Sequence, residues 1–368
     1  MESSYKRLGD FIRLVDLRNT ELKVKTLLGV SIEKKFIPSI ANTIGTDMKS
    51  YKIVKKGQFA YGTVTSRNGD KVSIALLKDY EECIISSAYL VFEIIDERQL
   101  NPDYLMMLFS NPEFDRYARY NSWGSAREVF SWDDLCRTEM SIPSIEEQEK
   151  IVRWYKTIED RIDLLKNEDY TLLNIIKNIM LEHRSKHSDY LSIGEYCTRI
   201  TSGGTPSRTN NSYWNSRDIP WLKNGEVKNN IVIETEEYIS KKGLNESSAK
   251  IIKKHSVLMA MYCVSEPQVS INEIETTTNQ AICCMETTSL KDSSYLCAYL
   301  MTFGRDLTKD ANGAAQQNLN QEQIKEFRIV KPDNVIKHNL EIIFLRRICL
   351  AKELNLLNKT KNALLFNI

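Results

Sequence analysis

The sequence lacks the features that mark membrane, secreted and metal-binding proteins. No apolar run approaches the roughly 20 residues that a membrane-spanning helix needs, and the first residues lead into no apolar secretory segment. The 8 cysteines are scattered without a Cys-x-x-Cys pair, which favours buried free thiols over disulfides or a zinc site. We therefore expect a cytoplasmic protein with no membrane contact and no bound metal.

An excess of either charge is also missing. The 50 basic residues face 49 acidic ones, which leaves a formal net charge of +1. A surface that binds nucleic acid must therefore be local. Basic clusters that can neutralise phosphates, or can be ordinary solvated charge, stand at Lys34-Lys35, Lys55-Lys56, Arg67 with Lys71, Arg116 with Arg119, and Lys241-Lys242.

Common catalytic motifs do not occur. We find no Gly-x-x-x-x-Gly-Lys-Ser/Thr phosphate loop, no Gly-x-Gly-x-x-Gly and no His-Glu-x-x-His. The sequence therefore lacks the usual binding motifs for nucleotide hydrolysis and cofactor chemistry. Asn111-Pro112-Glu113-Phe114 differs at Glu113 from the Asn-Pro-Pro-aromatic motif of adenine methyltransferases, and no glycine-rich loop precedes it. A turn before a helix is the favoured interpretation there. We expect no catalytic residue and no cofactor.

The chain does contain a long, diverged repeat. Segments of the first half are echoed in the same order in the second half, with offsets of about 185 to 200 residues. The matched pairs are Tyr5–Asp10 with Tyr190–Glu195, Ile53–Gly57 with Ile251–His255, Pro102–Leu105 with Ser293–Leu296, Phe130–Leu135 with Leu319–Ile324, and Met140–Pro143 with Ile329–Pro332. Their common order indicates a duplication.

A long helical segment follows each half of the repeat. Neither proline nor glycine occurs between Glu146 and Ser185, and apolar residues recur at coiled-coil spacing at Ile151, Tyr155, Ile158, Ile162, Leu165, Leu172, Ile176 and Ile179. The segment from about Asn334 shows a similar stripe at Leu340, Ile343, Leu350, Leu354, Leu357 and Leu364. Asp169 interrupts the first stripe, and Arg347 and Lys361 interrupt the second. We expect the stripes to bury each other within one chain, with homodimerisation as the alternative.

The second half of the repeat carries an exposed polar loop. Residues 201–208, TSGGTPSR, cannot form a helix or a central strand. Tyr213-Trp214 and the stretch from Asp218 to Glu226 then bring together aromatic, basic and amide groups, which proteins use to clamp phosphates and to contact base edges. For Trp214 and Trp221, anchoring a small core is the favoured alternative to DNA contact.

These segments resemble the target recognition domain of type I restriction-modification specificity subunits. The resemblance rests on TSGGTPSR (201–208), the Tyr213-Trp214 pair, IPWLKNGEV (219–227) and GAAQQNLNQEQIKEFRIVKP (313–332). The first half fits less closely, through GVSIEKKFIPSI (29–40), YKIVKKGQFAYGT (51–63) and WGSAREVFSWDDLCRTEMSIPSIEEQEKI (123–151). It lacks the Ser-Gly-Gly-Thr-Pro loop, so contacts cannot be transferred between the halves by position.

The resemblance implies a non-catalytic subunit that binds a bipartite double-stranded DNA target, one part with each recognition domain. Methyltransferase subunits, with or without a motor-endonuclease subunit, would supply the chemistry. We predict an α+β, pseudo-twofold fold in which two similar recognition domains are separated by two long helices that form an antiparallel intramolecular coiled coil. The predicted boundaries are 1–145 and 187–333 for the domains, and 146–186 and 334–368 for the helices.

The predicted DNA contacts lie in polar loops, because amides can pair with adenine and arginine with guanine. In the first domain they are Thr65, Ser66, Arg67, Asn68, Ser125 and Arg127. In the second domain they are Ser202, Gly203, Gly204, Thr205, Ser207, Arg208, Tyr213, Lys223, Asn224, Gln316, Gln317 and Asn318.

Two other functions compete with DNA recognition. One is an interaction scaffold that dimerises through its helices and has no affinity for DNA. The other is an autonomous nuclease or methyltransferase hidden in a diverged domain. Salt-dependent DNA binding separates the first alternative from a specificity subunit, and turnover by the chain alone would identify the second.

Overall fold

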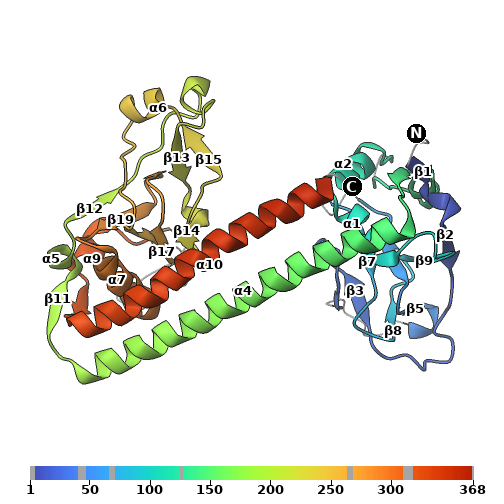
Figure 1. Ribbon diagram of the computed structural model, residues 1–368, viewed down its shortest axis with the longest axis horizontal. Helices are drawn as coiled ribbons and strands as arrows, with labels where there is room; N and C mark the ends of the chain where they lie inside the picture. The colour runs from blue at the N-terminus through green and yellow to red at the C-terminus, as the bar shows by residue number, and fades with distance from the viewer. Residues whose placement is uncertain are drawn as a thin grey trace. The chain divides into compact units, whose positions relative to one another are not determined.

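A computed structural model describes residues 5–39, 47–65, 71–124, 127–262, 268–309 and 318–366. The chain divides into two compact units, one formed by Met1–Arg161 with Asn358–Ile368 and the other by Ile162–Leu357. Two long helices, α4 (Ile145–Lys186) and α10 (Asn334–Phe366), contribute to both units (Figure 1). Within the described residues, no helix is long and apolar enough to cross a bilayer.

The first unit is built on a four-stranded antiparallel sheet. Besides its parts of α4 and α10, its elements are β1 (Tyr5–Arg7), η1 (Leu8–Asp10), β2 (Ile12–Val15), β3 (Leu28–Val30), β4 (Phe36–Pro38), η2 (Met48–Ser50), β5 (Lys52–Lys55), β6 (Phe59–Gly62), β7 (Ser73–Leu76), β8 (Glu82–Ile85), β9 (Leu90–Ile94), α1 (Pro102–Ser110), α2 (Pro112–Tyr120), α3 (Trp132–Arg137) and β10 (Glu139–Ser141). The main sheet has the order β2-β9-β6-β7, and three strand pairs, β1-β10, β3-β4 and β5-β8, lie outside it.

The second unit contains a five-stranded sheet and a separate three-stranded sheet. Besides its parts of α4 and α10, its elements are β11 (Tyr190–Ser192), α5 (Ile193–Tyr196), β12 (Arg199–Ser202), η3 (Asn211–Tyr213), β13 (Ile219–Leu222), η4 (Asn224–Glu226), β14 (Ile231–Val232), β15 (Glu237–Ile239), α6 (Lys241–Asn245), β16 (Val257–Ala260), β17 (Val269–Asn272), β18 (Thr277–Thr278), β19 (Ile282–Glu286), α7 (Leu290–Phe303), α8 (Asp306–Lys309), α9 (Gln321–Glu326) and β20 (Arg328–Val330). The sheet orders are β12-β19-β16-β17-β14 and β15-β13-β18, and β11 pairs with β20.

Residues of the main sheets alternate between two apolar clusters. In β6, Phe59 and Tyr61 join one cluster and Ala60 joins the cluster on the opposite face. In β16, Met259 joins one cluster and Leu258 joins the cluster on the opposite face. Because both faces are covered, these strands are apolar throughout instead of alternating with polar residues.

The duplication inferred from the sequence is confirmed in the strands that close each unit. β1 pairs antiparallel with β10 so that Tyr5 lies opposite Ser141, and β11 pairs antiparallel with β20 so that Tyr190 lies opposite Val330. The hydroxyl of Tyr104 donates to the carbonyl of Ser141, and that of Tyr295 donates to the carbonyl of Val330. Equivalent residues therefore make equivalent contacts in both units.

Two equivalent glycines show the same correspondence. A Cβ atom on Gly9 would lie 2.8 Å from Cβ of Cys136, and one on Gly194 would lie 2.9 Å from Cγ of Lys325. Cys136 belongs to α3 and Lys325 to α9, the short helices whose sequences match in the repeat. Glycine is required at position 9, where the backbone passes close to α3, and at position 194 a side chain would displace that of Lys325.

The starts of α3 and α9 are also equivalent. Ser131 caps α3 and Asn320 caps α9, and each cap is completed by a side chain three residues later, Asp134 or Gln323. The Asn111-Pro112 segment, by contrast, starts α2, with the Asn111 side chain accepting a hydrogen bond from the Glu113 amide. This confirms its interpretation as a turn before a helix.

The two long helices pair within each unit, as predicted. In the first unit, Lys361 of α10 lies 3.5 Å from the carboxylate of Glu159 of α4. In the second unit, Ile162, Leu165, Ile176, Phe344 and Leu350 of these helices are all buried. The 42 residues of α4 contain neither proline nor glycine and rise about 63 Å at 1.5 Å per residue.

Two of the three residues that interrupt the apolar stripes bind each other. The guanidinium of Arg347 makes two hydrogen bonds to the Asp169 carboxylate, of 2.7 and 3.2 Å, and donates a third, of 2.8 Å, to the carbonyl of Asn229. The Arg347 side chain is only 1% exposed. Asp169 and Arg347 therefore form an ion pair with a buried guanidinium, which joins α4, α10 and the turn before β14.

Candidate nucleic-acid interface

The predicted recognition loop of the second unit is held tightly against its own domain. The Gly204 amide donates to the carbonyl of Thr278 over 2.8 Å. A Cβ atom on Gly203 would lie 2.1 Å from that carbonyl oxygen, and one on Gly204 would lie 2.2 Å from Oγ of Ser248. Both glycines are therefore needed for close backbone packing, and the loop leaves β12 along a defined path.

Two tryptophans hold the loop through hydrogen bonds to its carbonyl groups. Trp221 is 2% exposed and its indole N–H donates to the carbonyl of Gly204 over 3.0 Å. The indole N–H of Trp214 donates to the carbonyl of Ser207 over 3.0 Å, and its ring packs edge to face on Trp221. The favoured interpretation of Trp221 as a core anchor is confirmed.

Arg208 lies above these rings. Its guanidinium carbon is 3.6 Å from the centroid of Trp214 and 4.7 Å from that of Trp221, and the guanidinium is 2.6 Å from the Glu237 carboxylate. Half of the Arg208 side chain is exposed. Stacking and ion pairing hold the guanidinium in one place with an open edge, as a bidentate contact to guanine or phosphate requires.

Lys223 shares the same acidic partners. Its ammonium lies 2.7 Å from the Glu236 carboxylate and 3.3 Å from that of Glu237. Partial burial tends to raise the pKa of Glu237, but hydrogen bonds from Arg208 and Lys223 outweigh it and lower that pKa. The two cations are thus balanced by two carboxylates, and DNA phosphates would have to compete with Glu236 and Glu237 for them.

The other predicted contacts of this unit are distributed around that centre. The Tyr213 hydroxyl donates to Glu246 over 2.8 Å, and the Thr205 hydroxyl donates to the Gln280 side chain over 2.6 Å. Ser207 is exposed at the loop tip, Ser202 is half-buried at the end of β12, and Asn318 is exposed at the edge of a described segment. Gln316 and Gln317 lie outside the described residues.

Asn224 has an unused hydrogen-bonding atom. Its Nδ2 donates to the carbonyl of Tyr262 over 3.5 Å, while its buried Oδ1 has no hydrogen-bond partner within the part of the chain that the structure describes. Because this oxygen is shielded from solvent, Asn224 would have to move before its acceptor could contact a base.

The first unit presents a smaller candidate surface. A tight turn is closed by reciprocal backbone hydrogen bonds between Trp123 and Val129. Gly124 has a φ of +140°, and a Cβ atom there would lie 2.2 Å from the carbonyl oxygen of Arg127, so the turn requires glycine. Arg127 and Trp123 are exposed on it.

Thr65 takes a different position in this unit. It is 1% exposed, and its hydroxyl donates to the carbonyl of Glu128. Its side chain is thus placed to anchor the neighbouring turn. Ser66, Arg67, Asn68 and Ser125 lie outside the described residues.

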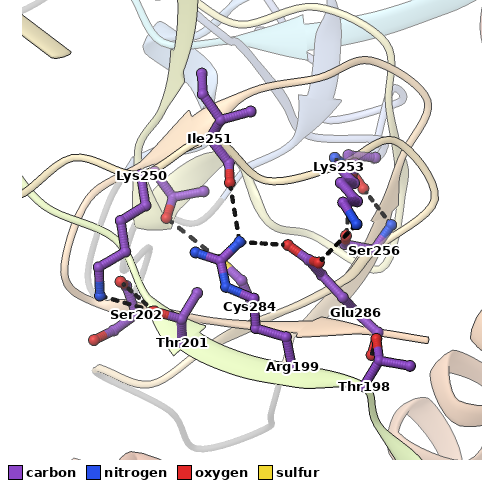
Figure 2. Close-up of polar contacts among 12 residues, drawn as sticks. Thr198, Arg199, Thr201, Ser202, Lys250, Ile251, Lys253, Ser256, Cys284 and Glu286 are labelled. Atoms are coloured by element: carbon purple, nitrogen blue, oxygen red, sulfur yellow. Dashed lines mark hydrogen bonds and ion pairs between the residues drawn. The ribbon is translucent and has the colours of Figure 1, made fainter. Parts of the chain in front are cut away.

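One basic cluster was not singled out from the sequence. Arg199 and Thr201 of β12, Lys250 and Lys253 of the segment before β16, and Glu286 of β19 lie together, as Figure 2 shows. We call Arg199, Lys250 and Lys253 the β12 basic cluster. In the sequence, Lys253 belongs to the repeat segment Ile251–His255, and Arg199 lies more than fifty residues before it. No local pattern links them.

Comparison with known protein families gives a match over most of the chain. The model of the type I restriction modification DNA specificity domain matches residues 2–174 and again residues 188–343. The two matched regions correspond to the two halves of the internal repeat.

Individual relatives agree with this match. The type I restriction enzyme MjaIX specificity subunit of Methanocaldococcus jannaschii is 21% identical over 298 residues, which is 74% of this chain and 69% of that protein. The EcoR124I/EcoR124II specificity subunit of Escherichia coli is 25% identical over 88 residues, which is 24% of this chain and 22% of that protein. The crystal structure of the type I restriction-modification system S subunit from M. genitalium shares the fold, with a TM-score of 0.56 and 14% identity over 98% of this chain and 94% of that one.

Proposed function

The chain belongs to the type I restriction modification DNA specificity family, and on that basis we propose that it reads a DNA target in two parts, one with each recognition domain. The observation that carries this proposal is the internal duplication. Two domains with the same closing strands, tyrosine contacts and helix caps are two copies of one reader. Duplicated readers on one duplex suit a target with two specified parts and a gap.

The long helices are proposed to set that gap. α4 is a continuous helix of 42 residues that contributes to both units. Paired DNA readers on one face of the duplex stand about 34 Å apart, or a multiple of it. A continuous helix of about 63 Å is long enough to hold two domains at such a distance.

The chemistry is assigned to partners. We propose that the chain catalyses no reaction and directs methyltransferase subunits to the target, with or without a motor-endonuclease subunit. The predicted contacts retained in this proposal are the exposed or half-exposed ones: Ser202, Thr205, Ser207, Arg208, Tyr213, Lys223, Asn224 and Asn318 in the second unit and Arg127 in the first. Thr65, Gly203 and Gly204 are proposed to position the loops around these contacts.

A second apolar stripe on α10 supports a protein partner. Val335, Ile342 and Leu356, spaced at multiples of seven residues, are 69%, 53% and 66% exposed, and Leu345 is 47% exposed. Cys349, seven residues after Ile342, is exposed as well. An exposed stripe with this spacing is typical of a helix that packs against a further helix. We propose that a methyltransferase subunit covers it.

DNA recognition is tested by equilibrium binding. The target is first mapped by methylome sequencing of cells that express the chain with its methyltransferase partner. The purified complex should then bind that duplex at least about 1,000-fold more tightly than a duplex with one scrambled part, because specific binding adds base contacts to phosphate attraction. Scrambling either part should have a similar effect. Equal affinity for all three duplexes, or no affinity at all, contradicts the proposal.

The partner surface is tested by placing charges on the stripe. The double variant Ile342→Glu, Leu345→Glu should co-purify with the methyltransferase subunit at less than about one tenth of the wild-type yield, since carboxylates in an apolar interface are costly to bury. Asn178→Glu, on an exposed position of α4, adds a carboxylate elsewhere and should leave the yield unchanged. Both variants should keep the wild-type melting temperature, and a full yield of complex from the double variant would exclude this surface.

A further inference from the structure

We propose that the β12 basic cluster, Arg199, Lys250 and Lys253, binds the sugar-phosphate backbone of DNA next to the recognition loop of the second unit. This inference rests on the proposed function and adds a phosphate-binding site to it. None of the three residues was among the predicted contacts.

The cluster is organised around one buried carboxylate. Arg199 donates to the Glu286 carboxylate over 2.9 Å and lies 3.4 Å from the carbonyl of Ile251. Lys253 lies 3.9 Å from the other Glu286 oxygen, on the far side from Lys250 in Figure 2. The Glu286 side chain is 5% exposed, so it orders the cations from beneath and does not cover them.

Lys250 is placed by a separate contact. Its ammonium donates to the Thr201 hydroxyl over 2.9 Å, at the end of β12 that leads into the loop. Figure 2 shows Lys250 on one side of Arg199 and Lys253 on the other, with Glu286 between Arg199 and Lys253, and β12 is the edge strand of its sheet. Cations that lie side by side at the edge of a domain can neutralise neighbouring phosphates of a duplex.

Among the residues that the structure describes, the ion pairs do not balance the charge of the cluster. Three cations face one carboxylate, which leaves two positive charges. The neighbouring Lys254 and His255 bind a second carboxylate, Glu273, at 2.8 and 2.9 Å, and Lys352 of α10 binds the same carboxylate at 2.8 Å. Arg208 and Lys223, by contrast, are matched by two carboxylates, Glu236 and Glu237. The unbalanced charge therefore distinguishes the β12 basic cluster from the balanced pair of Arg208 and Lys223.

Exposure and position favour DNA as the ligand. The side chains of Arg199 and Lys253 are 42% and 76% exposed. The recognition loop adjoins the cluster along two stretches of chain: Gly203 directly follows β12, and Gly204 packs against Ser248, two residues before Lys250. A phosphate held by the cluster would lie beside the loop that is proposed to contact bases. Lysines on flexible stems act as point charges, so they position the duplex without reading its sequence.

The test measures how binding depends on salt. The complex carrying Lys250→Gln, Lys253→Gln or both is titrated with the mapped duplex and with a scrambled duplex between about 50 and 200 mM salt. Each substitution should reduce the slope of log K against log[salt] by about 0.9, and the double substitution by about 1.8. Both duplexes should lose affinity by the same factor. Arg199 is left in place because its removal would deprive the buried Glu286 of its closest partner.

Lys331→Gln is the matched control. Lys331 is 65% exposed and lies 3.7 Å from Asp189, so it resembles Lys253 in exposure and pairing, and its variant should keep the wild-type slope. If the double variant keeps the wild-type slope, the phosphate site is wrong but the proposed function stands. The same holds if the substitutions change only the ratio of the affinities for the mapped and the scrambled duplex. A wild-type complex without salt-dependent DNA binding overturns both. Unchanged melting temperatures exclude misfolding as the cause of a lower slope.

Discussion

Replacing Asp169 with leucine should lower the free energy of unfolding by about 3 to 5 kcal/mol, although leucine suits the apolar stripe that Asp169 interrupts. The loss arises at Arg347, which is 1% exposed and keeps only the carbonyl of Asn229 once the carboxylate is gone. One of its nitrogens, Nη1, has no hydrogen-bond partner among the described residues even in the wild type. A buried guanidinium without its counter-charge is one of the most costly defects that a single substitution creates. Urea unfolding followed by circular dichroism measures the change.

The neighbouring pair provides the control. Glu168 binds Arg346 with the same helix-to-helix geometry, at 2.6 Å, but the two side chains are 39% and 46% exposed. Glu168→Ala should therefore cost less than about 1 kcal/mol. The double variant Asp169→Leu, Arg347→Leu removes both charges and should recover most of the stability lost in Asp169→Leu. Equal, small effects of the Asp169 and Glu168 variants would show that the buried pair does not hold the helices together.

Inserting one heptad into each long helix should widen the gap in the methylated target by about three base pairs. Seven residues add about 10 Å at 1.5 Å per residue, and the DNA duplex rises 3.4 Å per base pair. The insertions belong after Arg161 in α4 and after Leu357 in α10, where the two units divide. A whole heptad preserves the apolar stripes and leaves the Asp169 pair with Arg347 intact. Methylome sequencing should find the original sites unmodified and the widened sites modified.

A heptad inserted into only one helix tests whether the wider gap requires both helices to be lengthened together. In the wild type, Lys361 lies 3.5 Å from the carboxylate of Glu159. Seven residues added to α4 alone should move Glu159 out of reach of Lys361. That variant should lose stability and methylate neither the original nor the widened target. An unchanged gap after the double insertion would mean that the helices do not set the distance.

Part of the candidate site could be predicted from local sequence. The Gly203-Gly204 loop, Trp221 and Arg208 were recognised from their residue types and spacing, and the structure brings them together around Glu237. The β12 basic cluster could not be found in this way, because Arg199 meets Lys250 and Lys253 only when β12 lies beside the segment that precedes β16. Nor could sequence show that Glu236 and Glu237 neutralise Lys223.

The sequence by itself determined the duplication and the long helices. The duplication is found by comparing the two halves of the chain, and the helices depend on spacing within a few residues, where residue type decides the conformation. Only the tertiary structure decided that Asp169 and Arg347, 178 residues apart, neutralise each other, and that Thr65 is buried while Lys253 faces solvent. The physical reason is that burial and pairing of charges depend on which distant segments meet, and the periodicity of a single segment carries no information about its neighbour.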